Sequence, residues 1–505
     1  MKTNKIITIG LLSAGMLLTG CTDSFLEVKS YTQNPIEDYF TDSAHVHEAL
    51  VAAYDPMHWP DWAMGQYNPQ NVMSDIMADD IWPGGQSKTD NQYWHLMMNY
   101  EAKPNNCMTG LWTDEYSGVK RANDLMKYIQ QAGPNIPADA AKMWTAEGRV
   151  LRAYYYNNLW KFWGNIPYYT VNLESPYTAP QLSADEVYGN VIADLESVID
   201  ENTLPMKWDS DNLGRMSGAM AKMLYAEMVM YQNDNSRYSK ALTYMKDIIG
   251  SGQYDLNPDY AALWKQTGEW CIESIYEINY TDDKSFRGWG SGEALIAGGT
   301  VLPRLVSNPG GVADLGIDDG WGFCPVRTET YQRYADNDKR RDATCLDLRN
   351  YDYNARYQDT KFWLAKYTAY SENVARATGD KQLNYNNNLR IYRYSETLLN
   401  AAELILRTNG SDTEAKGYLT KVRQRAGLQT EKDATIDNII EERHLEFVGE
   451  GKRYWDLVRT GKASTVLVPD EYGYRTNTWS ENRKYQPIPN TEMAADPALK
   501  QNADY

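Results

Sequence analysis

The sequence is poor in cysteine, histidine and positive charge, and each shortage argues against a class of function. It has 5 Cys and 5 His among 505 residues, and they form neither an HExxH helix nor a metal-site spacing. Lys and Arg number 50 against 68 Asp and Glu, so the formal net charge is -18. Because an acidic chain repels nucleic acid and anionic headgroups, we expect neither as a partner.

Long apolar runs are also missing, except for one near the N-terminus. Lys2 and Lys5 precede an uncharged run over residues 6–18 that is too short to span a bilayer comfortably. The run ends in the letters LTGC, the order of a bacterial lipoprotein cleavage site, with Cys21 last. We therefore expect residues 1–20 to be a signal peptide, Cys21 to carry the lipid, and residues 21–35 to form a tether. Ordinary secretion with an accidental cysteine is the alternative.

The remaining cysteines are too few and too scattered to form a disulfide framework. One disulfide in an oxidising compartment is possible, but the sequence does not assign it. These four residues are Cys107, Cys271, Cys324 and Cys345.

Phenylalanine is scarce as well, with 7 residues against 39 Tyr and 16 Trp. Tyr and Trp combine a flat apolar face with a polar edge, which suits surfaces that are both wet and adhesive. Much of this aromatic content must still lie in the core, because Trp is highly buried on average.

Helical patterns dominate the first half of the chain and return after residue 390. Gly133, Pro134 and Pro137 break a predicted helical hairpin, Gly164 ends its second helix, and Ser217 is a plausible N-cap. Ten clustered glycines between residues 288 and 322 mark an irregular stretch over 265–390. Such a stretch is usually functional or disordered, and its interleaved Trp and Tyr argue against disorder. The predicted helices cover residues 107–131, 138–163, 183–200, 217–233, 238–249, 391–407, 414–427 and 436–449.

A charge lies on the apolar face of the last predicted helix. Arg443 falls in the stripe formed by the isoleucines of 436–440 and Phe447. Glu446 and Glu450 lie on adjacent turns of that face, so they are the expected partners. We interpret the group as a buried structural ion network, with a catalytic Glu–Arg site as the alternative.

Six segments resemble the SusD/RagB family in order and across nearly the whole mature chain. The stretch from Glu441 to Leu457 is the most specific of them. They are CTDSFLE from Cys21, EGRVLRAY from Glu147 running on to WGNIP from Trp163, ESI from Glu273, YSETLLNAAE from Tyr394, EERHLEFVGEGKRYWDL from Glu441, and the tail from Pro487 to Asn502.

The resemblance implies a mostly α fold, in which four helical pairs similar to tetratricopeptide repeats carry an irregular, loop-rich ligand-binding region. We divide the chain at 36–264 and 265–505 on this basis. The resemblance also implies a lipid-anchored, surface-exposed protein of a Gram-negative outer membrane that caps a SusC-like TonB-dependent transporter. Family members commonly bind oligosaccharides or polysaccharides, and some handle peptides. It implies neither an enzymatic activity nor a cofactor.

Two loop regions offer the flat aromatic faces and polar rims that sugars need. Trp flanked by Gly lacks neighbouring side chains that would cover it, so exposure is plausible. The alternative for each Trp is core packing, which we expect for Trp160, Trp163 and Trp455. The candidate ligand-binding residues are Trp82, Trp289, Trp321, Tyr93 and Trp94, with Asp80, Arg287 and Asn91 at the rim.

A lipid-anchored glycan-processing enzyme is the rival function. Asp79-Asp80 is its best acidic pair because it adjoins Trp82, but sequence cannot show the carboxylate separation that hydrolysis needs. The alternative for such pairs is solvated loop charge or turn capping. Within the binding class, a peptide ligand is the alternative, and it would be expected to use backbone-pairing edges in place of an aromatic platform.

Overall fold

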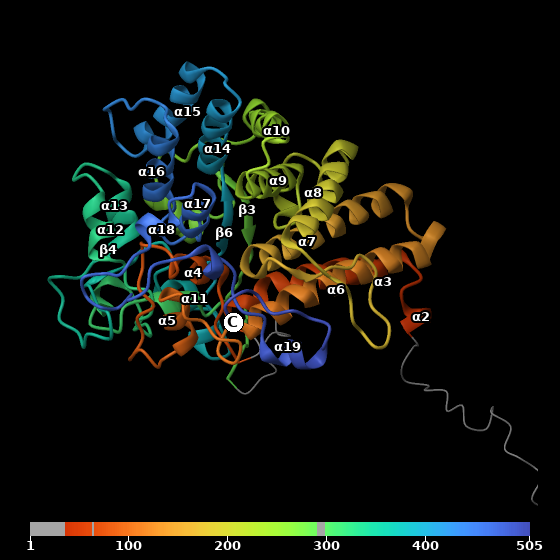
Figure 1. The fold of residues 1–505 in the computed structure, drawn as a ribbon, viewed down its shortest axis with the longest axis horizontal. Coiled ribbons are helices and arrows are strands. Elements are labelled where there is room, and N and C mark those ends of the chain that lie inside the picture. The colour runs from red at the N-terminus through yellow and green to blue at the C-terminus, as the bar shows by residue number, and fades with distance from the viewer. Residues whose placement is uncertain (1–35, 63–64, 290–297) are drawn as a thin grey trace, which may run out of the picture.

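The computed structural model describes residues 36–62, 65–289 and 298–505, and this part of the chain is mostly helical (Figure 1). The predicted signal peptide, Cys21 and the whole predicted tether lie outside it. No helix among the described residues is both long and apolar enough to cross a membrane.

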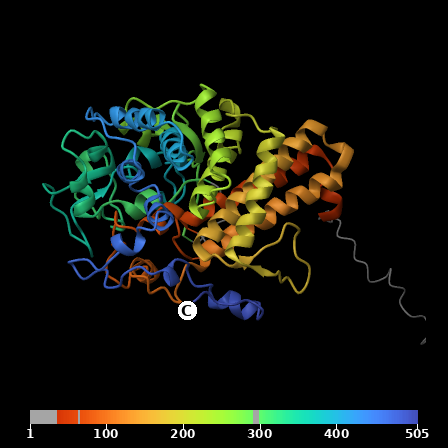
Figure 2. The ribbon, with the colours of Figure 1, turned by 45° about the horizontal axis from the view of Figure 1, so that its top comes forward.

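Eight long helices form the scaffold, and each packs against the next one along the chain. In Figures 1 and 2 they run from one end of the molecule toward its centre, and short loops join α6 to α7, α9 to α10 and α14 to α15. Seven of them correspond to the predicted helices other than the last, and α3 has no predicted counterpart. The eight are α3 (Ser43–Tyr54), α6 (Thr109–Ala132), α7 (Ala138–Trp163), α8 (Ala184–Glu201), α9 (Gly218–Gln232), α10 (Tyr238–Gly250), α14 (Tyr394–Arg407) and α15 (Asp412–Arg425).

The helix ends follow local chemistry that is legible in the sequence. Ser183 and Glu186 form a capping box at the start of α8, and the Ser217 side chain accepts from the Met220 amide at the start of α9. Gly164 ends α7 with a φ of +69°, which is the left-handed region that glycine enters readily. The predicted N-cap at Ser217 and the predicted stop at Gly164 are both confirmed.

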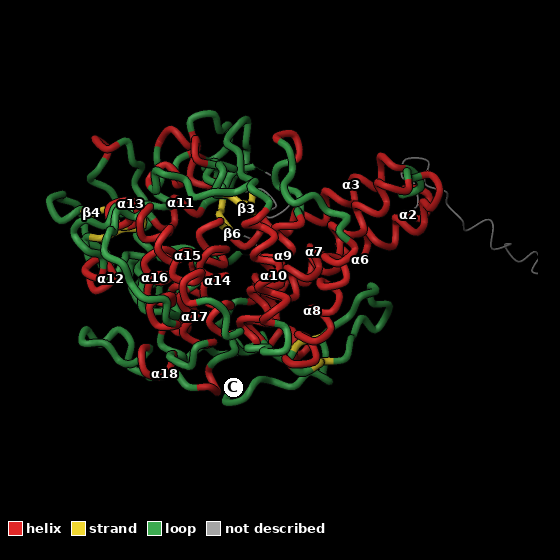
Figure 3. The backbone as a smooth tube through the Cα atoms, turned by 90° about the horizontal axis from the view of Figure 1, so that it is seen from above, coloured by secondary structure: helices red, strands yellow, loops and turns green. Residues whose placement is uncertain are grey.

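Most of the rest of the chain is loop-rich and lies at the end of the molecule away from α3 and α6 (Figure 3), whereas α2, the segment around β1 and β2, and α19 lie beside α6. The described residues form three small antiparallel sheets, β1–β2, β3–β6 and β4–β5. Their strands are β1 (Ile166–Pro167), β2 (Gln181–Leu182), β3 (Ser274–Ile278), β4 (Cys345–Asp347), β5 (Phe362–Leu364) and β6 (Leu389–Arg393). The remaining helices are α2 (Ile36–Tyr39), α4 (Gln70–Asp75), α5 (Gln92–Met98), α11 (Leu302–Val306), α12 (Thr328–Arg333), α13 (Arg340–Thr344), α16 (Ile436–Phe447), α17 (Arg453–Arg459), α18 (Ala463–Val466) and α19 (Asn490–Ala495).

The buried ion network predicted around α16 exists, but its pairing differs from the prediction. Arg443 pairs with Asp456 at 2.8 Å and Glu396 at 3.2 Å, not with Glu446 or Glu450. Glu446 and Glu450 instead form ion pairs with Arg393, at 2.9 and 2.8 Å. The periodicity of one helix finds the charged face but does not show which neighbouring helix supplies the counter-charge.

The segment over residues 70–80 is embedded in the C-terminal half. Asp79 pairs with Arg453 at 2.8 Å, and the buried Asp80 carboxylate contacts the His444 imidazole. The Gly451 amide donates to Asp75 at 3.0 Å. These contacts cross the division that we placed at residue 264.

Candidate functional site

Four aromatic side chains from three distant segments meet on the loop-rich side, and we call them the aromatic platform: Trp62, Tyr67, Trp289 and Trp321. The Trp289 ring centroid lies 5.0 Å from that of Trp62 and 5.7 Å from that of Trp321, at interplanar angles of 65° and 35°. Tyr67 meets the edge of Trp321 at 5.5 Å. These tilted arrangements are favourable for aromatic pairs.

The aromatic platform is covered below and open above. Trp289 is 44 % exposed, Tyr67 and Trp321 are half-buried, and Trp62 is 8 % exposed. Fully buried Val301 and Leu383 pack beneath it. The open side therefore presents flat apolar faces with polar edges, which is what the C–H face and hydroxyl edge of a sugar require.

A buried ion pair joins two of the segments that carry the aromatic platform. Arg287 contacts Asp61 at 3.0 Å and donates to the Trp62 carbonyl at 3.3 Å. Asp61 also accepts from the Val301 amide at 2.8 Å. Burial disfavours the charge on Arg287, but Asp61 outweighs it and raises the pKa of the guanidinium above its ordinary value. Arg287, predicted as a rim residue, is 5 % exposed and positions Trp62 and Trp289 instead.

The loop that carries Trp289 is docked on residues 379–384. Asn384 donates to the Arg287 carbonyl at 2.9 Å, and Asp380 accepts from the Trp289 amide at 3.0 Å. A Cβ on Gly379 would lie 2.4 Å from the Arg287 carbonyl oxygen, so only glycine allows this approach. The described part of the loop is thus held in place by backbone contacts.

Tyr93 and Trp94 support the aromatic platform from below. Both donate to the Tyr67 carbonyl, at 2.7 and 3.1 Å, and both are buried. Their predicted role as ligand contacts does not fit this burial, because neither ring has a free face. Asn91, half-buried just before α5, stays a predicted rim residue.

The structure corrects the prediction for Trp82 and Asp80. Trp82 is 1 % exposed, so no ring face is available for a ligand. The glycines that suggested exposure serve close packing instead, because a Cβ on Gly84 would lie 2.6 Å from the Pro325 ring. Asp80 is fully buried.

Asp79, Asp80 and His444 have ligand atoms within 4.8 Å of one another and could by spacing hold a metal ion. The Arg453 guanidinium already contacts both Asp79 oxygens, at 2.8 and 3.1 Å. Burial raises the pKa of Asp79, but His444 and Arg453 outweigh it and hold that pKa well below its usual range. This group is therefore an internal ion network, and because Asp80 is fully buried a glycan cannot reach the Asp79-Asp80 pair.

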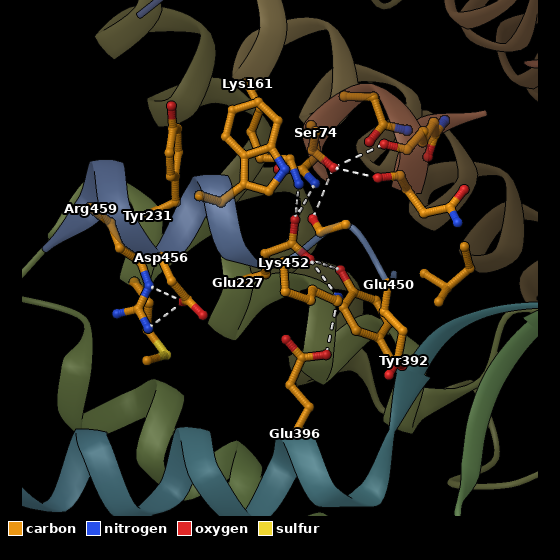
Figure 4. A pocket seen from close by; sticks show the side chains of 18 of the residues that line it. Ser74, Lys161, Glu227, Tyr231, Tyr392, Glu396, Glu450, Lys452, Asp456 and Arg459 are labelled. Carbon is orange, nitrogen blue, oxygen red and sulfur yellow. Dashed lines mark hydrogen bonds and ion pairs between the residues drawn. The ribbon is translucent and has the colours of Figure 1, made fainter. Parts of the chain in front are cut away.

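An interior cavity of about 80 Å³ lies between α7, α9, α14 and α17 (Figure 4). Its charges are paired, with Lys161 on Glu227 and with Lys452 on Glu396 at 3.0 Å. Ligand sites typically enclose about 300–1,000 Å³, and this cavity is far smaller. This cavity therefore does not carry the candidate site, which we assign to the aromatic platform because its rings meet and remain partly exposed.

Two open hollows lie elsewhere on the surface. One of about 410 Å³ lies beside α3 and β3, and its lining includes Val51 and Ile278. The other, of about 430 Å³, lies between α6 and α19, and its lining includes Tyr116, Tyr169 and Tyr177. The second is the more aromatic, so Tyr177 is a matched comparison for Trp289.

Sequence reasoning found Trp289 and Trp321 but missed Trp62 and Tyr67. Both follow a short 3₁₀ helix, η2 (Asp55–Asp61), in a segment without clustered glycines. The adjacent Asp61 is the one local signal that this segment contacts a distant one. A buried carboxylate needs a counter-charge, and Arg287 supplies it.

The fold and sequence match known proteins along the whole described chain. Residues 215–505 match the model of the SusD family, and residues 24–226 match a model described as "Starch-binding associating with outer membrane". Surface glycan-binding protein A from Bacteroides thetaiotaomicron, solved alone and with laminarihexaose, is 56% identical. Its TM-score is 0.88, over 92% of this chain and 100% of that one.

Two further relatives agree with this likeness. A laminarin-binding SusD-like protein is 29% identical with a TM-score of 0.82, over 92% of this chain and 100% of that one. SusD-like protein P38 from Formosa agariphila is 25% identical over 100% of both chains. The chain therefore belongs to the SusD family.

Proposed function

We propose that this protein is a surface glycan-binding lipoprotein and that the aromatic platform binds a laminarin-type glucan. The carrying observation is the meeting of half-exposed Trp289 with Trp321 over a floor fixed by the Asp61–Arg287 pair. Support comes from the 56% identical protein solved with laminarihexaose and from the laminarin-binding relative.

The protein delivers its ligand and does not cleave it. Lipid on Cys21 anchors it to the outer membrane beside a SusC-like TonB-dependent transporter, which imports the captured glycan. Weak binding at a single site suffices there, because tethering beside the transporter raises the effective ligand concentration.

Isothermal titration of the lipid-free chain, starting after Cys21, tests this proposal. The ligands are laminarihexaose, with cellohexaose and maltohexaose as glucose oligomers of other linkages. We expect Trp289→Ala and Trp321→Ala to abolish laminarihexaose binding, and Tyr177→Ala to leave it unchanged.

Three results would contradict the proposal. Binding lost in Tyr177→Ala but kept in Trp289→Ala would move the site to the hollow beside α19. Release of new reducing ends from laminarin by the pure protein would favour an enzyme. Binding to peptides with no response to any glucan would favour the peptide-binding alternative.

A further inference from the structure

A second group of aromatic rings lies directly above the buried Trp82, and we call it the tyrosine cluster: Tyr357, Tyr472 and Tyr474. Tyr472 and Tyr474 stack at 5.8 Å with an interplanar angle of 24°. Tyr357 meets Tyr474 at 5.4 Å, and the edge of Trp82 meets Tyr474 at 5.2 Å. Tyr472 is 48 % exposed and the other two are half-buried, so part of the tyrosine cluster faces solvent.

The loop that carries Tyr472 and Tyr474 is fixed from both sides. The Asp470 carboxylate accepts from their backbone amides, at 2.8 and 3.1 Å. The buried Arg475 guanidinium donates to the carbonyls of Met98 at 2.9 Å and Ala78 at 2.7 Å. A surface that is already ordered does not lose conformational entropy when a ligand binds.

Polar groups surround the tyrosine cluster. The Tyr472 hydroxyl donates to Glu329 at 3.1 Å, and the Arg327 guanidinium lies 3.8 Å above the Trp82 ring. A half-exposed arginine, Arg356, precedes Tyr357, and it has no ion-pair partner among the described residues. Flat rings with donors and acceptors at their edges are the combination that sugars require.

Two backbone hydrogen bonds, both made by Gly85, connect the segment of the aromatic platform that carries Trp321 to the segment of the tyrosine cluster that carries Tyr357. The Gly85 amide donates to the Gly322 carbonyl at 2.7 Å, and the Tyr357 amide donates to the Gly85 carbonyl at 3.0 Å. Gly85 therefore links the backbone of Gly322, next to Trp321, to the backbone of Tyr357. A Cβ on Gly322 would lie 2.8 Å from Arg356 Cδ, so the Arg356 side chain covers the glycine that follows Trp321.

We propose that the tyrosine cluster is a second contact site for the same glucan chain, with Arg356 as the polar group between the two sites. This inference rests on the proposed function of the aromatic platform. A short oligosaccharide occupies the aromatic platform alone, whereas a longer chain also reaches the tyrosine cluster. The protein therefore selects long chains, because two contacts on one tethered ligand add to its affinity.

Titration with laminaritriose and with laminarin tests the second site. We expect Tyr472→Ala and Tyr357→Ala to weaken laminarin binding about three- to ten-fold, the loss typical of one stacked ring. Both variants should bind laminaritriose as the wild type does. Tyr472→Phe keeps the ring and should retain most of the laminarin affinity. Tyr177→Ala is the matched control, and the thermal midpoint of each variant checks that it has folded.

The outcomes separate the second site from the first. Laminarin affinity that is unchanged in both Tyr→Ala variants overturns the second site, as does a wild type that binds laminaritriose and laminarin equally. Loss of laminaritriose binding in the Tyr472→Ala variant also overturns it. Failure of the wild type to bind any glucan would instead be the failure of the proposed function itself.

Discussion

Replacement of Arg287 by Met should destabilise the protein and loosen the aromatic platform together. The change removes the charge but keeps an apolar stem, and it leaves Asp61 buried without its counter-ion. Breaking a buried pair from one side costs about 3–5 kcal/mol. We expect the lower end, about 3 kcal/mol, because amide hydrogen bonds from Trp62 and Val301 still hold Asp61.

The assay is urea unfolding of wild type, Arg287→Met, Asp61→Asn and the double variant, compared by midpoint and slope. The double variant leaves no unpaired charge, so its loss should fall short of the sum of the single losses by about 1–3 kcal/mol. Laminarihexaose affinity should fall about ten-fold in Arg287→Met, because Trp62 and Trp289 must then be ordered on binding.

Arg349→Met is the matched control. Arg349 also pairs with an aspartate, Asp347, at 2.6 Å, but its side chain is 58% exposed. Its loss should cost less than about 1 kcal/mol, as for other surface pairs. The reasoning is refuted if Arg287→Met costs no more than Arg349→Met, or if the Asp61 and Arg287 losses are additive.

Three further predictions concern pH, a glycine and the thiols. Burial raises the pKa of Glu269 to about 7, so the folded protein favours the neutral carboxyl. The contribution of this carboxyl to the free energy of unfolding is fully present below about pH 4.5 and is lost as pH rises through 7. Glu269→Gln should therefore gain about 1–3 kcal/mol over wild type above pH 7 and nothing at pH 4, and equal urea midpoints at pH 8 would contradict this. Gly322 has a φ of +72°, so Gly322→Ala places an alanine in the left-handed region with its Cβ against Arg356. The substitution should lower the free energy of unfolding by about 1–2 kcal/mol and weaken laminarin binding. An unchanged urea midpoint would contradict this prediction. The described cysteines are free, so a thiol reagent at pH 8 should modify half-buried Cys271 first, and a different first site by mass spectrometry would contradict this order. Burial raises the pKa of the three slow thiols: Cys107, Cys324 and Cys345.

Much of the scaffold was predictable because its signals are local. The 138–163 helix is bounded by Pro137 and Gly164, and the structure places α7 over the same residues. Trp160, Trp163 and Trp455 are buried, as their positions in helices predicted. The pairing of Arg443 was not predictable, because Glu396 and Asp456 come from other helices.

The candidate site was predictable only in part, since it depends on contacts between distant segments. Glycines beside a Trp indicate exposure only where nothing else packs against them. Trp289 is half-exposed, whereas distant residues cover the ring of Trp82, namely Tyr472, Tyr474 and Arg327. The glycines after Trp82 pack against residues 322–325. Trp62 and Tyr67 carry no such signal, because their role arises from the Asp61–Arg287 pair.

The embedding of residues 70–80 in the C-terminal half has a consequence for how the protein is made. Asp75, Asp79 and Asp80 leave the ribosome more than 350 residues before their partners at His444, Gly451 and Arg453. Until those partners arrive, three carboxylates that end up buried must stay hydrated, and α4 cannot reach its final place. The N-terminal helices can fold as they emerge, but these contacts form only after residues 444–453 have been synthesised. A chain that is truncated before residue 444 therefore leaves these N-terminal acids without partners.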